Sequence, residues 1–417
     1  MRLSQLFTKT SKNAPSDEVS KNAQLLIRAG FIHKEMAGVY VFMPLGLRVL
    51  ENIKQIVREE MDRIGGQEVQ MTVLQPKEIF EKTDRWDDSK VDNWFKTKLT
   101  NGTELGMGLT HEEPIVDMLA EYINSYKDLP LLTYQIQTKF RNELRAQAGL
   151  LRGREFIMKD MYSFARSQEE HQEIYEKVAK AYTRVYERLG IGDITYRTYA
   201  DGGIFTSRFS DEFQMLSEIG EDTIFVDKEK KIAVNQEVID DPRLAETKID
   251  KQKLKEYKAI EVGNIFPLES KYTDALGVYF TDSDGAQQKI IAGCYGIGVS
   301  RLVGAIAEHF ADEKGLVWPA NIAPAKVYLV RIGESKEVVD EADKLYSKLQ
   351  DNDITVLYDD RDIRPGEKFS DAELMGIPYR IVVSEKTLTG NKFEFKKREK
   401  SDIEMLDIDG ILKVLVS

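Results

Sequence analysis

The sequence predicts an α/β protein in which a large α+β core, built around an antiparallel hairpin, is followed by a smaller α/β domain. Residues 132–164 alternate apolar and polar side chains at period two, which is typical of two strands joined by a loop. Beyond residue 326, strand and helix patterns alternate, which favours a largely parallel sheet. The 417 residues, 42% apolar and 31% charged, suffice for two or three globular domains.

The composition excludes several classes of protein. No apolar stretch suits a signal peptide or a membrane span of about 18 residues, so a cytoplasmic location is expected. The single cysteine, Cys294, and four scattered histidines leave no spacing for a disulfide framework or structural zinc, so any metal should arrive with a phosphate substrate. The net charge of −12 argues against indiscriminate binding of polyanions such as DNA, but it permits an RNA site with local basic patches.

The predicted hairpin carries polar chemistry on one face. Arg141 and Glu143 project together because residues two apart in a strand share a face. On the returning strand, a second set of side chains also projects to a common face: Arg154, Phe156, Met158 and Asp160. The two sets can meet across an antiparallel pair, and a guanidinium, a carboxylate and an aromatic ring suit the phosphate, amino group and base of a nucleotide. A solvated face with ordinary ion pairs is the alternative.

The elements before the hairpin follow from local patterns. Helices are predicted over 19–29 and from 46 to 64, short strands over 39–43 and 68–74, and a hairpin turn at 101–104. A helix should start at Pro114, with Thr110 and Glu113 forming its capping box. This arrangement leaves Glu112 spare, so that it could face a cationic ligand.

The elements after the hairpin include a long helix over 169–188 and a loop at Gly202-Gly203. Residues 227–260 are dominated by charge and predict a surface excursion or a remnant subdomain rather than core. In the last domain, strands are predicted over 327–332, 354–358, 379–383 and 392–396, and helices over 336–350, 367–375 and from about 408.

A glycine turn links strand and helix near residue 296. A hairpin around Asp284-Gly285 leads into Gly296-Ile297-Gly298, which invites comparison with a dinucleotide fingerprint. Arg301 stands where the third glycine would be, so we reject a Rossmann fold. Arginine in the first turn of a helix opposes the helix dipole, and a nearby anion explains Arg301 better than helix stability does.

The motifs together resemble one family over nearly the whole chain. PLGLRVLENIKQIVREEM is similar to motif 1 of class II aminoacyl-tRNA synthetases, FRNE with Phe156 to motif 2, and GIGVSR to motif 3. The chain also resembles bacterial-type prolyl-tRNA synthetases, in a short form, at GLTHEEP, YQIQTKFRNE, GREFIMKDMYSF, GCYGIGVSRLV, VWPANIAP and YDDRDIRPGEKFSDAELMGIP. The resemblance implies a class II antiparallel sheet flanked by helices and a C-terminal α/β anticodon-binding domain.

The resemblance also implies roles for individual residues. ATP would be bound by Arg141, Glu143, Arg152, Arg154, Phe156 and Arg301, of which Arg141 and Arg301 would be catalytic. Arg141 would hold the α-phosphate and the proline carboxylate, while Phe156 and Arg301 would sandwich the adenine. Proline would be bound by Thr110, Glu112, Arg141, Met158, Asp160 and Phe205. No protein metal ligands are implied.

The implied activity is ATP-dependent activation of L-proline and its transfer to tRNA(Pro) by a cytoplasmic homodimer that uses ATP and Mg²⁺. Residues 1–224 and 261–318 would form the catalytic domain, 225–260 a short remnant in place of an editing insertion, 319–326 a linker, and 327–417 the anticodon-binding domain. No membrane or DNA partner is implied.

Three departures from the family pattern have consequences. The segment between motifs 2 and 3 is too short for the editing insertion, so Ala-tRNA(Pro) would not be cleared in cis. Ser210-Asp211-Glu212-Phe213 replaces the usual Ser-His-Glu-Phe, which would place a fixed anion near the proline pocket. In the motif 2 loop, Arg145-Ala146-Gln147-Ala148 replaces Arg-Pro-Arg-Phe, and Arg145 is still expected at the tRNA acceptor end.

Other interpretations stay open. In the last domain Arg361 and Arg364 are candidates for anticodon contacts, with an ion-paired turn as the alternative. A threonine enzyme would need Cys and His zinc ligands, which the chain cannot supply. A noncatalytic relative should lose the arginines of motifs 2 and 3, and both are present. An ATP-dependent ligase without tRNA would not need residues 326–417.

Overall fold

The structure, a computed structural model, describes residues 1–144, 146, 148–247, 249–390 and 392–416. The described chain divides into two compact units. One comprises Met1–Met36, Tyr40–Asn52 and Val303–Ser417, and the other comprises Ala37–Val39 and Ile53–Leu302. We call them the first and the second unit. The candidate ATP and proline residues belong to the second unit.

The α-helices are α1 (Lys21–Arg28), α2 (Pro44–Arg63), α3 (Lys77–Glu81), α4 (Glu112–Leu119), α5 (Gln168–Arg188), α6 (Lys271–Leu276), α7 (Val299–Phe310), α8 (Lys336–Gln350), α9 (Pro365–Met375), α10 (Glu385–Leu388) and α11 (Ile408–Val416). Throughout the described chain, no helix combines the length and the apolar character that a membrane crossing requires.

The strands before residue 230 are β1 (Ile32–Met36), β2 (Val39–Phe42), β3 (Gln67–Glu68), β4 (Leu74–Pro76), β5 (Lys96–Lys98), β6 (Glu104–Met107), β7 (Leu131–Phe140), β8 (Glu155–Ala165), β9 (Thr195–Asp201), β10 (Phe209–Leu216) and β11 (Asp222–Asp227). The later strands are β12 (Ile232–Asn235), β13 (Lys255–Glu269), β14 (Tyr279–Thr281), β15 (Gln287–Lys289), β16 (Ile291–Gly298), β17 (Val327–Ile332), β18 (Val356–Asp359), β19 (Tyr379–Ser384), β20 (Phe393–Lys397) and β21 (Glu404–Leu406).

The second unit is built on one large sheet with the strand order β10-β9-β12-β11-β13-β16-β8-β7-β3. The predicted hairpin is confirmed, because β7 and β8 pair antiparallel with Gln135 opposite Asp160 and Lys139 opposite Phe156. β16 pairs antiparallel with both β8 and β13. The glycines predicted to form a turn, Gly296 and Gly298, instead lie within β16, and α7 follows directly. They are not part of a Rossmann βαβ unit, as predicted.

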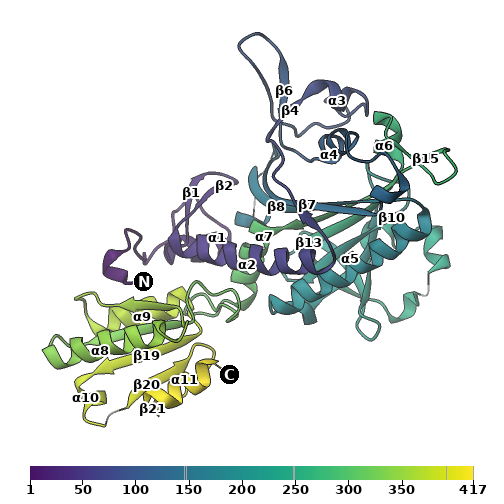
Figure 1. Ribbon diagram of the computed structural model, residues 1–417. Coiled ribbons are helices and arrows are strands. Elements are labelled where there is room, and N and C mark those ends of the chain that lie inside the picture. Colours follow the sequence, from purple (N-terminus) through teal and green to yellow (C-terminus); the bar gives the residue numbers. More distant parts are fainter. Residues whose placement is uncertain (145, 147, 248, 391, 417) are drawn as a thin grey trace. The chain divides into compact units, whose positions relative to one another are not determined.

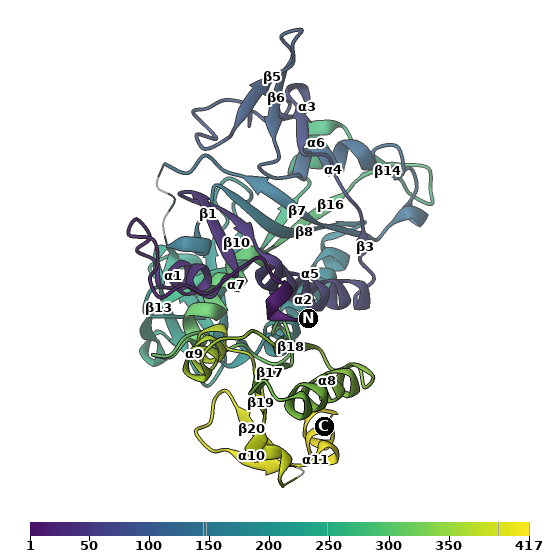
Figure 2. The same cartoon turned by 90° about the vertical axis from the view of Figure 1, so that its left-hand side faces the viewer.

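Helices cover both faces of this sheet (Figures 1 and 2). On one face lies α5, whose Tyr182 and Tyr186 rings contact the Phe213 ring of β10. On the other face lie α4 and α6, and Ile115 of α4 belongs to the same buried cluster as Tyr162 of β8. Side chains on both faces of β7 and β8 are thus enclosed.

Two strand predictions need correction. The strand predicted over 68–74 is divided, because its start (β3) pairs with β7 whereas its end (β4) pairs with β6. The segment 227–260 is not merely a surface excursion, because β12 lies between β9 and β11 inside the large sheet and Val234, Val238 and Leu244 form a buried cluster. Because the segment is rich in charged residues, its few buried apolar positions could not be recognised from the sequence.

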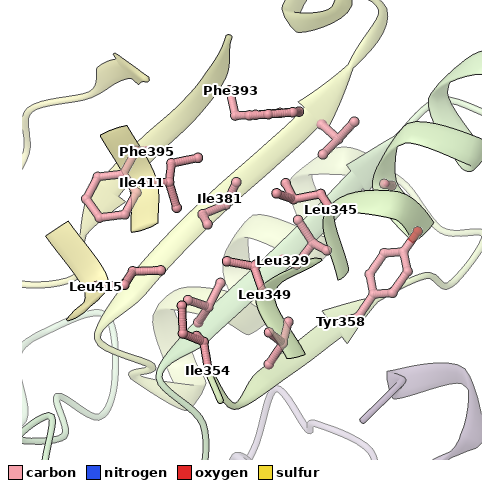
Figure 3. Packing of buried hydrophobic residues seen from close by; sticks show 14 of the residues in the cluster. Leu329, Leu345, Leu349, Ile354, Tyr358, Ile381, Phe393, Phe395, Ile411 and Leu415 are labelled. Atoms are coloured by element: carbon pink, nitrogen blue, oxygen red, sulfur yellow. The ribbon is translucent and has the colours of Figure 1, made fainter. Parts of the chain in front are cut away.

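The last domain, which belongs to the first unit, has the strand order β18-β17-β19-β20-β21. β17 pairs parallel with β18 and β19, whereas β20 pairs antiparallel with β19 and β21. Figure 3 shows its core, in which Leu345 and Leu349 of α8 pack with Leu329, Ile381 and Phe395 of the sheet. Strand and helix bounds agree closely with those predicted, although α10 and β21 were missed.

The helix α5 buries a histidine against the sheet. His171 is 1% exposed, and neither ring nitrogen has a hydrogen-bond partner among the described residues. Its ring lies beside that of Tyr175. Burial lowers the pKa of His171 to about 4, so the ring is neutral in the folded protein near pH 7.

This environment predicts a pH-dependent loss of stability. Between about pH 6.5 and pH 4 the unfolded chain binds a proton at His171 that the native protein does not, so the free energy of unfolding falls as the pH falls. His171→Phe should make this fall less steep, measured by urea unfolding at several pH values. The exposed His33 provides the control, as His33→Phe. An unchanged slope in His171→Phe would contradict the prediction.

Candidate active site

Two cavities lie over the large sheet of the second unit. The first has a volume of about 260 Å³ and is lined by residues that include Glu143, Arg152 and Asp222. The second has a volume of about 160 Å³ and is lined by residues that include Thr110, Glu112, Met158, Asp160 and Phe205. Arg141, Phe156, Glu261 and Arg301 line both cavities, which therefore meet at these side chains.

The register of β7 and β8 brings the predicted side chains together. Gln135, Gln137 and Lys139 of β7 lie directly opposite Asp160, Met158 and Phe156 of β8. Gln135 is 1% exposed and Lys139 is 0% exposed. The alternative of a solvated face is therefore wrong, because the helices on this side enclose the polar surface.

Arg141 directly follows β7, and its backbone N–H donates to the carbonyl oxygen of Arg154. Its guanidinium carbon lies 5.1 Å from the centre of the Phe156 ring, and the side chain makes no hydrogen bond with the described residues. Burial and the charge of Arg301 lower the pKa of Arg141. Two guanidinium groups that share a partly enclosed space favour the binding of an anion.

Arg301 lies in the first turn of α7, where the sequence predicted a nearby anion. Its Nε donates to the carbonyl oxygen of Leu151 at 2.8 Å, and its Nη1 donates to the Oε2 atom of Glu261 at 3.0 Å. Glu261 belongs to β13, where this charged residue lies within an apolar run of the strand. The break in the apolar pattern could have revealed Glu261 from the sequence, but our sequence analysis did not use it.

The other nucleotide candidates are engaged in contacts within the protein. The Nε of Arg152 donates to Glu143 at 3.0 Å, and its Nη1 donates to Glu221 at 3.3 Å. Arg154 donates to the carbonyl oxygens of Glu143 and Ala37, both at 3.0 Å. Arg152 lines the first cavity, whereas Arg154 is not among the residues that line either cavity.

At the second cavity, the predicted capping box is wrong. α4 begins at Glu112 and not at Pro114, and the Thr110 hydroxyl lies 2.7 and 2.6 Å from the two carboxylate oxygens of Glu112. Glu113 instead accepts a hydrogen bond from Thr83 at 2.7 Å. A buried cation, Arg85, binds both carboxylates and so draws Glu113 away from the helix terminus.

Asp160 lines the second cavity. Its Oδ2 accepts hydrogen bonds from Gln135, Lys139 and Tyr162, each at 2.9 Å. Its Oδ1 is buried and has no hydrogen-bond partner among the described residues. An acceptor of this kind in a cavity wall suits a ligand that donates a hydrogen bond.

Lys139 is the cation behind Asp160. Its Nζ lies 2.6 Å from Nδ1 of His111, whose Nε2 lies 3.0 Å from the Thr72 carbonyl oxygen. Burial and the charge of Lys139 lower the pKa of His111 to about 4, so the ring is neutral near pH 7. A neutral ring that accepts from Lys139 must donate through Nε2, which fixes its tautomer.

The remaining wall of the second cavity is mostly apolar. Met158 projects from β8, and the ring of Phe205 lies 4.6 Å from that of Phe266. Cys294 of β16 also lines the cavity, and its thiol donates to Oε1 of Glu112 at 3.3 Å. Sequence reasoning missed Cys294 as a site residue, because a lone thiol has no motif.

Asp211 does not lie near the second cavity, and the expectation of a fixed anion there is wrong. Its carboxylate accepts a hydrogen bond from Tyr175 of α5 at 2.9 Å and pairs with Arg197 at 2.9 Å. Asp211 therefore faces α5, on the opposite side of the sheet from Asp160. Arg145, expected at the tRNA acceptor end, lies outside the described residues.

In the last domain, the two arginine candidates differ. The Nη2 of Arg361 binds Asp359 at 2.7 Å and Asp371 at 2.8 Å, as in the ion-paired turn that was the alternative. Arg364 directly precedes α9 and is exposed. No group of three or more His, Cys, Asp and Glu side chains that could hold a metal occurs within the described residues.

Comparison with known proteins places this geometry in a family. Residues 95–310 match the tRNA synthetase class II core domain (G, H, P, S and T), and residues 326–417 match the anticodon binding domain. A crystal structure of prolyl-tRNA synthetase from Cryptosporidium parvum, complexed with L-proline and AMP, superimposes with a TM-score of 0.76 at 16% identity. The superposition covers 95% of this chain and 74% of the Cryptosporidium parvum chain.

Curated relatives align over the full length. The proline–tRNA ligase of Rickettsia rickettsii is 38% identical, with 100% of each chain covered. That of Phenylobacterium zucineum is also 38% identical over 100% of both chains, and that of Anaplasma phagocytophilum is 36% identical over 99% of both.

The fold and the matched domains define a class II aminoacyl-tRNA synthetase with an anticodon-binding domain. Within this class, the chain belongs to the proline–tRNA ligase family, because its relatives of that name are more than a third identical over their whole length.

Proposed function

We propose that the protein joins L-proline to tRNA(Pro) in two steps, through a prolyl-adenylate. The observation that carries this proposal is the position of Arg141 where two cavities meet. One cavity offers an aromatic ring and guanidinium groups for a nucleotide, and the other offers buried carboxylates for an amino group. Support comes from the names of the relatives and from the proline and AMP in the Cryptosporidium parvum enzyme.

In the first step, an oxygen of the proline carboxylate attacks the α-phosphorus of ATP. A carboxylate–phosphorus bond forms, the bond to the β-phosphate oxygen breaks, and pyrophosphate leaves. Arg141 neutralises both reacting anions, since it reaches the two cavities and has no protein anion bound to it among the described residues. The rate gain comes from alignment and from charge stabilisation by fixed donors, without a covalent enzyme intermediate.

The nucleotide roles follow from the lining of the first cavity. Phe156 stacks on the adenine from one side, and Arg301, held by Glu261 and Leu151, closes it from the other. Glu143 accepts from the adenine amino group. Arg152 must release Glu143 and Glu221 before it can reach the outer phosphates, and Arg154 would act by holding the Glu143 backbone.

Mg²⁺ would enter with the ATP phosphates. The residues present fit it, because the Glu261 carboxylate lines both cavities and Asn264 presents a buried Oδ1 without a hydrogen-bond partner among the described residues. Mg²⁺ is commonly held by one or two protein oxygens together with phosphates and water. It would offset the phosphate charge, while Arg301 keeps the Glu261 carboxylate in place.

The amino group of proline would lie at the carboxylate end of the second cavity. Thr110 and Glu112 accept or share its protons, and the free Oδ1 of Asp160 supplies a further acceptor. Met158 and Phe205 contact the ring carbons. In this position the proline carboxylate points toward Arg141.

The second step requires tRNA, which the last domain would bind through the anticodon. The exposed Arg364 is the candidate for direct contact, while the paired Arg361 shapes the loop that carries it. Arg145 would contact the acceptor end.

We further infer a homodimer in the cytoplasm, where tRNA and ATP are found. Phe7, Val41 and Leu47 are 73%, 46% and 45% exposed and line a groove of the first unit with a volume of about 800 Å³. An apolar surface of this kind is typical of a contact between subunits.

The function is tested by amino-acid-dependent exchange between ATP and pyrophosphate. Proline should support rapid exchange, alanine weak exchange, and threonine none above the rate without amino acid. Threonine is not expected to work because threonine enzymes hold zinc through Cys and His ligands, which a chain with a single cysteine cannot supply. Exchange with none of the three would favour a noncatalytic relative.

The short segment between β10 and β13 predicts an editing defect. A pocket shaped for proline discriminates against alanine only through missing methylene groups, worth about 1–3 kcal/mol. Purified protein should therefore form Ala-tRNA(Pro) and leave it intact, measured by deacylation of preformed Ala-tRNA(Pro) beside a no-enzyme control. Rapid release of alanine would refute this prediction.

A further inference from the structure

At the carboxylate end of the second cavity, buried acids and buried cations are paired in a way that the proposed chemistry does not explain. Two carboxylates, Glu112 and Asp160, line the cavity. Directly behind them lie two buried cations, Arg85 and Lys139, which are not among the residues that line it. Each cavity-facing acid is thus bound to a cation that substrate does not touch.

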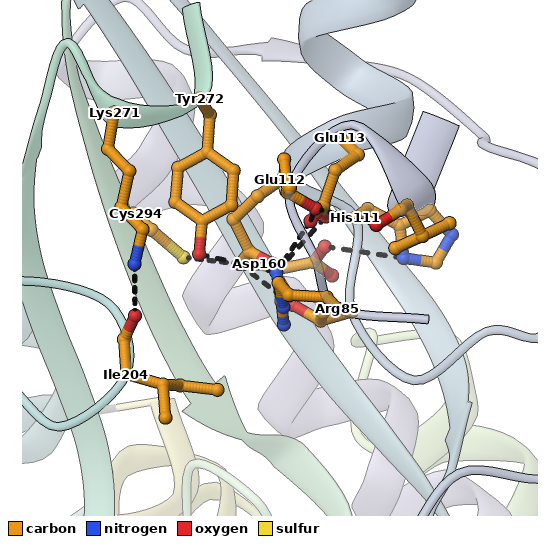
Figure 4. A network of polar contacts seen from close by, with 12 residues as sticks. Arg85, His111, Glu112, Glu113, Asp160, Ile204, Lys271, Tyr272 and Cys294 are labelled. Atoms are coloured by element: carbon orange, nitrogen blue, oxygen red, sulfur yellow. Dashed lines mark hydrogen bonds and ion pairs between the residues drawn. The ribbon is translucent and has the colours of Figure 1, made fainter. Parts of the chain in front are cut away.

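Arg85 binds two adjacent acids at once (Figure 4). Its Nη1 lies 3.0 Å from Oε2 of Glu112 and 3.0 Å from Oε2 of Glu113. The same nitrogen donates to the Tyr272 hydroxyl at 3.3 Å. The guanidinium carbon also lies 5.3 Å from the ring centre of Phe205, so this cation is held on several sides.

Without a cation, two neighbouring carboxylates in such a place could not both stay charged. Glu112 is 1% exposed and Glu113 is 0% exposed. Burial raises the pKa of Glu113, whereas at Glu112 the opposing effect of burial is exceeded by Arg85 and Thr110, which lower the pKa. Like charges in one buried site share a proton unless a counter-charge is present.

Asp160, like Glu112, is bound to a buried cation. It is 3% exposed, and the Nζ of the fully buried Lys139 lies 2.9 Å from its Oδ2. His111, on the other side of Lys139, is neutral and adds no charge. The unpartnered Oδ1 of Asp160 remains for a ligand.

The cations at this end of the cavity do not fully pair the acids. Arg85 is shared between Glu112 and Glu113, and Asp160, which is bound to Lys139, keeps an Oδ1 without a hydrogen-bond partner among the described residues. Buried charge of this kind is costly without a partner, so the site favours a ligand group that brings a positive charge. A protonated amino group does so.

We propose that Arg85 is a positioning residue for amino-group recognition: by binding Glu113 as well as Glu112, it keeps the cavity-facing Glu112 carboxylate ionised and in place. The proposal rests on the proposed function, in which proline brings the ammonium group. It assigns to Arg85 a role in substrate selection although this side chain does not touch the substrate.

Arg85→Met tests the proposal, because methionine keeps much of the volume and removes the charge. Glu112 and Glu113 should then share a proton. The KM for proline should rise at least about tenfold at pH 7 and less at pH 9, where that proton is lost. The KM for ATP and kcat at saturating proline should change little, and Arg85→Lys should restore most of the proline affinity.

A double variant separates this role from a structural one. Adding Glu113→Gln to Arg85→Met removes the acid with which Glu112 would share a proton, so Glu112 should be ionised again. The KM for proline should then recover in part. Arg197→Met is the matched control, because Arg197 also bridges two acids, Glu176 and Asp211, but on the α5 face of the sheet. It should leave the KM for proline unchanged.

A measurement without substrate completes the test. In Arg85→Met the native protein holds a proton that the unfolded chain lacks at neutral pH, so its free energy of unfolding relative to wild type should fall from pH 6 to pH 9. Equal loss of ATP and proline affinity, a proline defect that Glu113→Gln does not relieve, or a pH-independent stability difference would each overturn the proposal. Absence of proline-dependent exchange in the wild-type protein would refute the proposed function, and the stability measurement would still decide the charge assignment.

Discussion

The pairing register of β7 with β8 is the constraint on which the site depends. It places Gln135 opposite Asp160 and Lys139 opposite Phe156, and it aligns Arg141 with Arg154 just beyond the strand end. A slip of one residue would turn every one of these side chains to the other face of the sheet. The register is held by apolar positions on both faces, since Tyr134 and Met161 are buried on one face and Tyr162 on the other. Packing thus determines which polar groups meet in the cavities.

The two faces of the sheet use buried charge in different ways. On the α5 face, Lys159 donates to the Tyr182 hydroxyl and to the Tyr295 carbonyl oxygen, and Asp211 binds both Tyr175 and Arg197. These polar groups therefore pair with one another inside the protein. On the cavity face, Asp160 keeps an unpartnered oxygen and Arg141 a guanidinium without a hydrogen bond among the described residues. A ligand with an amino group and a carboxylate would satisfy both.

Burial of these charges links recognition to stability. Polar groups taken from water are tolerated only when they are paired, and a missing partner costs more than the pair itself contributes. The cavity face carries groups that the described protein atoms do not fully pair. We infer that binding of substrate stabilises the second unit, because it supplies the missing partners.

Much of this arrangement could be predicted from the sequence, because the information is local. The alternation in 132–164 predicted the hairpin and which side chains share its face, and the strand and helix periods after residue 326 predicted the last domain. The motifs around Arg141, Phe156 and Arg301 were sufficient to indicate the family. The individual roles of these three residues stay proposals.

The predictions that failed depended on contacts between distant segments. The capping box of Thr110 and Glu113 was locally sound, but Arg85, which lies well before it in the chain, binds Glu113 instead. Asp211 was placed by its motif, whereas its actual position follows from strand parity and from the helix α5. Cys294 had no motif to reveal it, since its importance comes only from its contact with the distant Glu112.

Single-turnover formation of prolyl-adenylate by Arg141→Ala would show whether Arg141 serves both cavities at once. We predict a loss of at least about 3 kcal/mol of transition-state stabilisation, more than a hundredfold in rate, because a preorganised charge at the reacting groups is removed. Binding of proline and of ATP should each weaken as well. Adenylate formation at a near-normal rate would contradict the role of Arg141.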